Sequence, residues 1–504
     1  MRRWPIYDTD SGYVILRIAL PLLTILILAS LYLCNLGGWL IHDDEGTDLY
    51  EIWRIGEGDV PARDVVTAQA PVFLLGGVAL GLLSDFSIVV LRGASALLVL
   101  GSALLVLLLG REIWSPRAGF LAAVIYLLNH LIHDQARLFR PDPWMLAFSV
   151  LGLYLFVLAQ TRERRFMFLL SGSVYGVATL CKLFGALPLG GCLLALAYDA
   201  LTNPLQRRRT VENIGLLLIP FLSVSLGGMV AFYPPGSTYY STVLGQHWQL
   251  GSEAGLTHRV TKGLVYLAFF TYRNLPFLFA VPVVYHLATS RDPGERAMGW
   301  QVPTAFAYLV LSRPLYVRYW LYLVPVFSLI LGHLIDVSIS WIRSRTGSRG
   351  RPLSLALGIL LVALATAQSV PIILRNTWRR ENDTLALASY IAAHTEPDEV
   401  VLSDYASLNV HARRRSVPQA SIIAGGRIAG GFVTAEGLIS EIEAHNVSMV
   451  LLHVSGGNPG PHHLVNLHHF DQFHAYLEEP FNVTGTFDRA GQIVEIYQSS
   501  SAGE

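Results

Sequence analysis

Long apolar runs separated by short polar segments dominate the first three quarters of the chain. The first run extends from Tyr13 to about Leu36, and a membrane span needs about 20 mostly apolar residues. It lacks a small-residue cleavage site, so we expect an anchor and not a cleaved signal. Ten further runs follow near residues 88–110, 118–133, 143–160, 167–183, 185–200, 212–233, 274–289, 298–313, 316–341 and 353–374. The pattern predicts an α-helical polytopic membrane protein with about eleven transmembrane helices.

One shorter apolar stretch, residues 70–83, does not fit this series. It begins beside Pro71 and is too short for an ordinary span. Counting it as a span would also invert the predicted side of every later loop. We therefore expect it to form an interfacial helix on the outer face of the membrane.

Arginine residues cluster in every second loop, which indicates a single consistent topology. The clusters are Arg2 and Arg3; Arg111 and Arg117; Arg162, Arg164 and Arg165; Arg207, Arg208 and Arg209; Arg291 and Arg296; and Arg343, Arg345, Arg349 and Arg351. Because positive charge accumulates on the cytoplasmic side, we expect a cytoplasmic N-terminus in a multi-pass cell-membrane protein. Segments 37–87, 134–142 and 233–273 then face outside, as does the chain after about Arg375.

Composition supports a membrane protein and excludes several other classes. The 504 residues are 53% hydrophobic and 14% charged, whereas a soluble globular protein has about 25% charged residues. High hydrophobicity excludes general disorder. The 36 basic and 36 acidic residues give a net charge of zero, so no nucleic-acid partner is expected. The three cysteines lie in apolar runs and do not suggest disulfides or a zinc site.

Composition changes near residue 380, where we place a boundary between a transmembrane domain (1–379) and a small outer α/β domain (380–504). The second part has 15 acidic residues and six arginines. Its apolar runs at 400–404 and 449–454 predict buried strands, and 382–394 and 434–445 predict helices. The glycine-rich segment 424–431 is interpreted as a loop. The histidine-rich segment 462–474 lacks a zinc-binding spacing, so a solvated polar face is favoured over a weak metal site.

Two charged segments on the expected outer face are the first functional candidates, because charges beside a bilayer are costly. One contains Asp43, Asp44 and Glu45, and the other contains Arg140 and Asp142. An ordinary alternative is a pair of solvated loops with helix caps, since an Asp followed by Pro suits a helix start. That alternative explains the acidic run less well, because three consecutive acids repel one another.

At these residues the chain resembles the GT-C superfamily, whose members are multi-span glycosyltransferases that use polyprenyl-phosphate-linked sugars. The sequence DDEGTDLYEIWRIGEGDVPARD at 43–64 is similar to the first outer loop of protein O-mannosyltransferases and the lipid A aminoarabinose transferase. The matching residues are Asp44, Glu45, Tyr50, Arg54, Gly58, Pro61, Arg63 and Asp64, followed by Arg92, Arg140 with Asp142, Lys182 and Arg318 with Tyr319. The resemblance covers about residues 10–340. One departure is Gln69, at a position where several members have a basic residue.

The resemblance implies an enzyme that transfers a hexosyl or pentosyl group for cell-envelope glycan biosynthesis. The implied catalytic residues are Asp44, as general base, with Glu45 and Asp142. The implied donor-phosphate contacts are Arg92, Arg140, Lys182 and Arg318, although such residues are also common interfacial anchors. The implied substrate contacts are Tyr50 and Tyr319. His247, in the third outer segment, is a further candidate that stays open as an acceptor or metal contact. The donor is a polyprenyl-phosphate sugar, the acceptor is a lipid, glycan or protein, and the surroundings are membrane lipids.

Three functions remain open from the residues alone. A transporter or flippase of a lipid-linked substrate places charges near the bilayer midplane on interrupted helices, often in repeated halves. Here the acids lie at outer span ends, which favours the transferase. A sensor with an outer ligand domain would not need acids in two membrane-edge segments. No cofactor is required by these residues, and a divalent metal has no motif in its support. An inverting single displacement is expected, with a covalent carboxylate intermediate as the competing mechanism.

Overall fold

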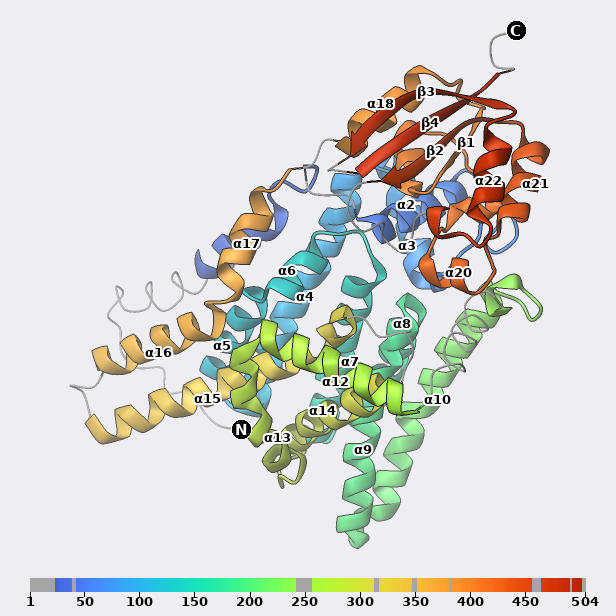
Figure 1. Ribbon diagram of the computed structural model, residues 1–504. Helices are drawn as coiled ribbons and strands as arrows, with labels where there is room; N and C mark the ends of the chain where they lie inside the picture. Colours follow the sequence, from blue (N-terminus) through green and yellow to red (C-terminus); the bar gives the residue numbers. More distant parts are fainter. Residues whose placement is uncertain are drawn as a thin grey trace.

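The computed structural model describes residues 23–38, 42–241, 256–311, 317–346, 351–380, 383–455, 464–489 and 492–500. Most of these residues are helical, and a four-stranded sheet lies toward the C-terminal end (Figure 1). The predicted class, a helical protein with a small C-terminal α/β unit, is confirmed.

Among the described residues, five helical segments are long and apolar enough to cross a membrane. Four are α4 (Ile88–Ile113), α7 (Pro141–Thr161), α10 (Arg207–Phe232), which η2 (Pro204–Gln206) precedes, and α15 (Leu323–Thr346), which η5 (Val317–Tyr322) precedes. The fifth combines η1 (Leu183–Ala186) with α9 (Leu187–Thr202). Two bent pairs raise the number to seven. They join α12 (Leu256–Arg273) to η4 (Leu275–Ala280) and α13 (Val281–Ala288), and α16 (Arg351–Thr366) to α17 (Ser369–Trp378) and α18 (Asp383–Ala393).

Other predicted runs fold as shorter apolar helices, so the count of about eleven spans stays a prediction. These are Leu23–Leu33, α5 (Pro116–Leu127) and α8 (Phe166–Cys181), and α14 (Pro293–Leu311) lies over the run at 298–313. Helices in this part pack closely through glycine. A Cβ atom on Gly119 would lie 2.2 Å from the carbonyl oxygen of Leu107, and one on Gly172 would lie 2.1 Å from that of Leu217. Close approach at small residues is typical of helix pairs in membranes.

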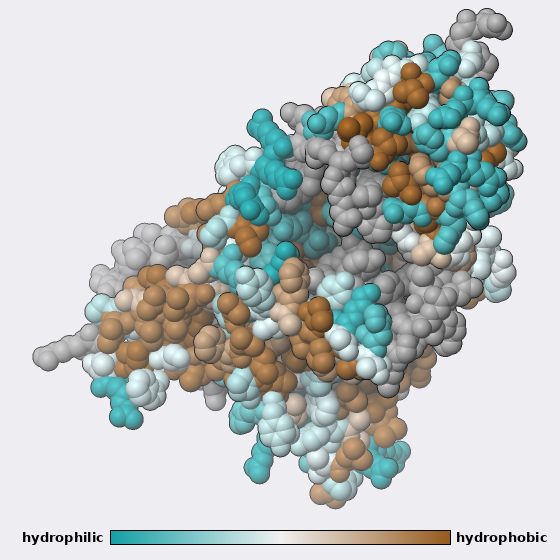
Figure 2. Space-filling model, in the orientation of Figure 1, coloured by the Kyte–Doolittle hydropathy of each residue, from teal (hydrophilic) through white to brown (hydrophobic). Residues whose placement is uncertain are grey.

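The surface, like the sequence, has a hydrophobic part and a hydrophilic part. Figure 2 shows hydrophobic residues spread over the helical part, whereas hydrophilic residues cover much of the C-terminal part. Large apolar side chains on α4, α10 and α16 are exposed, among them Leu97, Leu226 and Leu360. Exposed apolar side chains on several long helices suit contact with lipid.

The segment with Arg140 and Asp142 lies at the start of α7, and the acidic segment lies on the first of three short helices between the long ones. These short helices are α2 (Asp43–Gly56), α3 (Pro71–Ser84) and α6 (His130–Ala136). The first acidic segment is therefore a helix and not an irregular loop, and the side chain of His42 accepts a hydrogen bond from the backbone of Asp44 at its start. Helix α3 is separate, as predicted, and ends at Asp85 in a left-handed conformation. Its interfacial position stays a prediction.

The C-terminal sheet has the strand order β1-β2-β4-β3, with strands β1 (Val400–Ser403), β2 (Val447–Ser455), β3 (Phe481–Arg489) and β4 (Gln492–Ser499). Strands β1 and β2 are parallel, and the remaining pairs are antiparallel. The flanking helices are α18, α19 (Ala406–Ala412), α20 (Gly425–Ala429), α21 (Ala435–His445) and α22 (Phe470–Leu477), with single turns η7 (Pro418–Ser421) and η8 (Leu464–Asn466).

The predicted strands and helices of this part match β1, β2, α18 and α21, whereas the loop prediction for 424–431 is wrong. Residues 425–429 form helix α20, because backbone hydrogen bonds from Arg427 and Ile428 to Ala424 begin a turn despite the glycines. Part of the histidine-rich segment, including His462 and His463, lies outside the described residues.

The C-terminal part contacts the helical part through α2. The backbone and Cβ of Ser407 lie against Gly46, the Tyr50 hydroxyl accepts a hydrogen bond from the Ser416 backbone at 2.8 Å, and Arg413 contacts Asp85. Helix α2 thus lies between the sheet unit and the membrane helices (Figure 1).

Candidate active site

Helix α2 presents three acidic side chains on one face. Asp44, Asp48 and Glu51 are spaced four and three residues apart, which places them on the same side of a helix. Asp48 and Glu51 are completely buried, while the Asp44 side chain is about one third exposed. Burying carboxylates is costly unless partners or protons compensate, so this face indicates a functional site.

The two charged segments singled out in the sequence meet at Asp44. Its carboxylate forms an ion pair with Arg140, whose Nη1 lies 2.9 Å from Asp44 Oδ2. The Arg140 side chain is buried. Arg140 precedes α7 in an extended conformation, and Pro141 occupies the first helical turn. The helix start therefore fixes the backbone from which Arg140 reaches toward α2.

A second ion pair lies next to the first. Lys182 Nζ contacts both carboxylate oxygens of Asp142, at 2.7 and 2.8 Å. Lys182 lies where α8 ends, and its ammonium is 5.2 Å from the centre of the Tyr319 ring, a cation–π distance. The structure thus brings together Asp142, Lys182 and Tyr319, three of the residues expected at the site.

Glu45 and Arg92 form a third pair beneath these residues. Arg92 Nε and Nη2 bind the two carboxylate oxygens of Glu45 at 2.8 and 2.5 Å, and Nη1 donates to the carbonyl of Leu36 at 2.6 Å. The Phe139 backbone N–H also donates to Glu45, at 2.7 Å. Neither charged side chain is exposed. This arrangement supports the chain directly before Arg140 and Asp142, which suits a positioning role.

Asp48 links the first two ion pairs, although the sequence did not single it out as a site residue. Burial raises the pKa of its carboxyl well above the usual value; Asp44 and Asp142 raise it further, while Arg140 and Lys182 lower it. These electrostatic contacts place all five groups in one cluster. The Gln69 side chain donates to Asp48 at 2.8 Å, and as a neutral group it adds no compensating charge.

Glu51 extends the cluster toward the C-terminal part. Burial raises the pKa of its carboxyl, the nearby Asp48 raises it further, and Arg427 on α20 lowers it. Burial also lowers the pKa of the Arg427 guanidinium to about 10. The helical spacing of Asp44, Asp48 and Glu51 was a signal in the sequence. Arg427 had none, because it comes from a segment more than 350 residues later that was interpreted as a loop.

One other predicted residue, Tyr50, lies outside this cluster, and two more have side chains outside the described part of the chain. Tyr50 is buried against Ser416, so its hydroxyl joins α2 to the C-terminal part. Arg318 lies in η5 with its side chain outside the described part, and His247 lies outside the described residues altogether. Across the part of the chain that the structure describes, no group of three or more His, Cys, Asp or Glu side chains is arranged to hold a metal ion.

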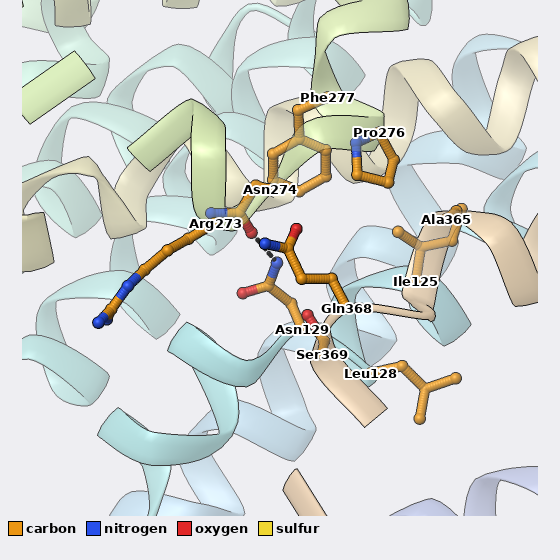
Figure 3. A pocket seen from close by; sticks show the side chains of 10 residues that line it. All are labelled: Ile125, Leu128, Asn129, Arg273, Asn274, Pro276, Phe277, Ala365, Gln368 and Ser369. Atoms are coloured by element: carbon orange, nitrogen blue, oxygen red, sulfur yellow. Dashed lines mark hydrogen bonds between the residues drawn. The ribbon is translucent and has the colours of Figure 1, made fainter. Parts of the chain in front are cut away.

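A separate pocket lies where the two bent helix pairs meet. It encloses about 250 Å³, part of it open to solvent. Figure 3 shows the side-chain amides of Asn129 and Asn274 beside Gln368 and Ser369. Asn129 Nδ2 donates a hydrogen bond to Asn274 Oδ1 at 2.8 Å. None of the acidic residues described above lines this pocket.

Comparisons with known proteins bear on the fold of the chain. The family model described as dolichyl-phosphate-mannose-protein mannosyltransferase matches residues 70–236, which include Arg92, Arg140, Asp142 and Lys182. The structure of ArnT from Cupriavidus metallidurans bound to undecaprenyl phosphate is similar over 98% of this chain and 100% of that one, with a TM-score of 0.67 and 15% identity. The chain has the GT-C fold.

Another GT-C protein is similar over a smaller share of its length. The oligosaccharyltransferase from Archaeoglobus fulgidus, in a complex with Zn and sulfate, matches 85% of this chain and 67% of its own, with a TM-score of 0.57 and 14% identity. No curated protein sequence matches the chain significantly. The GT-C resemblance expected from the sequence is confirmed, and the protein is a multi-pass membrane protein.

Proposed function

We propose that this protein is an integral-membrane glycosyltransferase that moves a sugar from a polyprenyl-phosphate donor to a hydroxyl or amine of an acceptor. The observation that carries the proposal is the junction of the Asp44–Arg140 and Asp142–Lys182 pairs beside buried Asp48. The GT-C fold supports it, as does the solved ArnT complex, which contains undecaprenyl phosphate. Nothing in the comparisons favours the transporter hypothesis.

Arg140 and Lys182 are proposed to bind the donor phosphate. When the bond from the anomeric carbon to the phosphate oxygen breaks, negative charge develops on the leaving phosphate, and preorganised cations stabilise it. Arginine suits this role because its planar fork binds two phosphate oxygens. Arg92 already binds both oxygens of Glu45, so we assign Arg92 and Glu45 to holding the segment around Arg140. Arg318 and Tyr319 are proposed to complete the donor side next to Lys182.

Asp44 is proposed as the general base. It is the most exposed carboxylate of the cluster, and a donor phosphate that binds Arg140 would release the Asp44 oxygen that Arg140 contacts. That oxygen would then accept the proton of the acceptor as the new glycosidic bond forms, which inverts the anomeric centre. Asp142 would position Lys182 and the acceptor. Tyr50 would act by holding α2 in place, and His247 is kept as a proposed acceptor contact.

The orientation in the membrane belongs to the same proposal. An active site on the outer face, with a cytoplasmic N-terminus and an outer domain from about residue 380, fits the arginine pattern. A reporter fused at either end, whose activity depends on the compartment, would test this orientation.

The direct test is a transfer assay. Membranes that contain the protein are given radiolabelled undecaprenyl-phosphate sugars, and mass spectrometry identifies the labelled lipid, glycan or protein product. We expect transfer with the native chain and loss of donor binding in Arg140→Ala. The proposal fails if no donor is consumed by protein that binds undecaprenyl phosphate. It also fails if Arg140→Ala binds the donor as tightly as the native chain does.

A further inference from the structure

Three buried side chains, Asp48 within the cluster and two beside it, have hydrogen-bonding atoms without a partner among the described residues. The atoms are Asp48 Oδ2, Glu51 Oε2, and Nε and Nη1 of Arg427. Asp48 and Glu51 have no exposed surface, and Arg427 exposes only 6%. Because leaving a buried polar atom unsatisfied is costly, most such atoms in proteins have partners. Several unsatisfied atoms in one place therefore indicate a group that binds there.

The three residues come from two parts of the fold and interact electrostatically. Asp48 and Glu51 lie one turn apart on α2, and Arg427 comes from α20 of the C-terminal part. Glu51 interacts with both Asp48 and Arg427. Within the described part of the chain, however, Arg427 has no ion pair within 4.0 Å of either carboxylate. One site is indicated because Asp48 and Glu51 lie one turn apart on the same face of α2, all three side chains are buried, and Glu51 interacts with Arg427.

Neighbouring residues hold this arrangement in place. The Gln69 side chain donates to the other oxygen of Asp48, at 2.8 Å, and the Ala68 backbone donates to Glu51 at 3.5 Å. The Tyr233 hydroxyl donates to the Gln69 carbonyl at 3.0 Å, and its ring stacks on Tyr239 with centroids 3.8 Å apart. One oxygen of each carboxyl group is therefore fixed, while the other is buried without a hydrogen-bond partner among the described residues.

We infer that Asp48, Glu51 and Arg427 form an acceptor subsite for a polyhydroxylated, sugar-like headgroup next to the proposed base Asp44. This inference rests on the proposed transferase function. A hydroxyl group both donates and accepts, so it satisfies a carboxyl oxygen and a guanidinium N–H at once. A phosphate would meet two acidic side chains, and an amine would meet Arg427. The mixture of donors and acceptors thus selects neutral hydroxyl groups.

The test is a binding measurement on the full chain in phosphatidylcholine nanodiscs, with empty nanodiscs subtracted. The probes are tritiated octyl glucoside, octylamine and octyl phosphate, each below its micelle-forming concentration. We expect the native chain to bind the glucoside in preference to the other two. Glu51→Gln and Arg427→Gln are expected to weaken glucoside binding at least tenfold. Arg427→Lys, which keeps the charge, is expected to restore part of it.

Arg413→Gln is the matched control, because Arg413 contacts Asp85 at the same junction but outside the cluster. Unfolding midpoints identify variants that fail to fold, and the nearly isosteric Glu51→Gln keeps the test valid if Arg427→Gln is unstable. Unchanged glucoside binding in both variants would overturn the inference, as would octylamine or octyl phosphate binding that depends on these residues. Binding of undecaprenyl phosphate is measured in parallel. Its dependence on Arg140 tests the proposed function separately.

Discussion

Glu45 and Arg92 form a bidentate ion pair in which neither side chain has any exposed surface. Removing one partner of a buried pair leaves an uncompensated charge or an unsatisfied donor, which typically costs about 3–5 kcal/mol. We therefore expect Glu45→Gln to lower the free energy of unfolding by roughly that amount, measured by denaturant unfolding in detergent. Transfer should also fall, because Glu45 accepts a hydrogen bond from Phe139, next to Arg140.

The control for this prediction is the exposed pair of Arg63 and Asp64, whose nitrogen and oxygen lie 2.8 Å apart. Exposed ion pairs contribute little to stability, because solvent screens them. Arg63→Gln should leave the unfolding curve unchanged. Equal losses of unfolding free energy in both variants would show that burial does not determine how much the Glu45–Arg92 pair contributes to stability.

Asp44→Asn tests the proposed base. The substitution keeps the size of the side chain and removes its capacity to accept a proton, and a general base typically contributes about 10²–10⁴-fold to a rate. We expect the transfer rate to fall within that range while undecaprenyl-phosphate binding stays intact. The rate is measured with saturating donor, and Asp64→Asn serves as the control. A rate within a factor of two of the native one would remove Asp44 from the mechanism.

The sequence predicted the fold class and the meeting of two charged segments because both follow from local patterns. Apolar runs identify membrane helices, and acidic or basic residues at their ends stand out against that background. Asp44, Arg140, Asp142 and Lys182 were found in this way, and the structure brings them together. Their catalytic roles remain predictions.

The sequence did not predict three features of the site. They are the presence of Arg427, the pairing of Glu45 with Arg92, and the helical form of α2. Contacts between residues far apart in the chain depend on how the helices pack against one another. The local spacing of apolar residues in a single sequence does not reveal that packing. Arg427 interacts with Glu51 of α2 only because the C-terminal part docks on that helix through α19 and η7. Helix α2 was expected as a loop because the segment is polar and lies between apolar runs, although Asp44, Asp48 and Glu51 follow a helical spacing.

The buried acids of α2 predict a pH-dependent stability. Burial raises the pKa of both Asp48 and Glu51 above their ordinary values of 3.8 and 4.5. Between the ordinary and the raised values, the folded protein binds more protons than the unfolded one, so the free energy of unfolding falls as the pH rises. For each extra proton that the folded protein binds, the free energy of unfolding falls by about 1.4 kcal/mol per pH unit.

We expect Glu51→Gln to make this decline shallower, since glutamine does not titrate. The measurement is the free energy of unfolding of native and variant protein in steps from pH 4 to pH 9. Groups that face Glu51 are Asp48, Arg427 and the Tyr233–Tyr239 pair, and the tyrosines are kept neutral by burial. A slope equal to that of the native protein would show that Glu51 is ionised in the folded state.

Gly46 makes the docking of the C-terminal part on α2 directly testable. A Cβ atom added at this position would lie 2.6 Å from the Ser407 side chain and 2.8 Å from its backbone nitrogen, closer than real atoms approach. Since backbone atoms cannot move aside cheaply, Gly46→Ala should displace α19 from α2 and weaken the Tyr50–Ser416 hydrogen bond. Gly101, also helical, has nothing within 4 Å of an added Cβ, so Gly101→Ala is the matched control. We expect faster proteolysis between residues 378 and 400, and slower transfer, only in Gly46→Ala. Equal proteolysis of the two variants would show that contact at Gly46 does not hold the C-terminal part against the site.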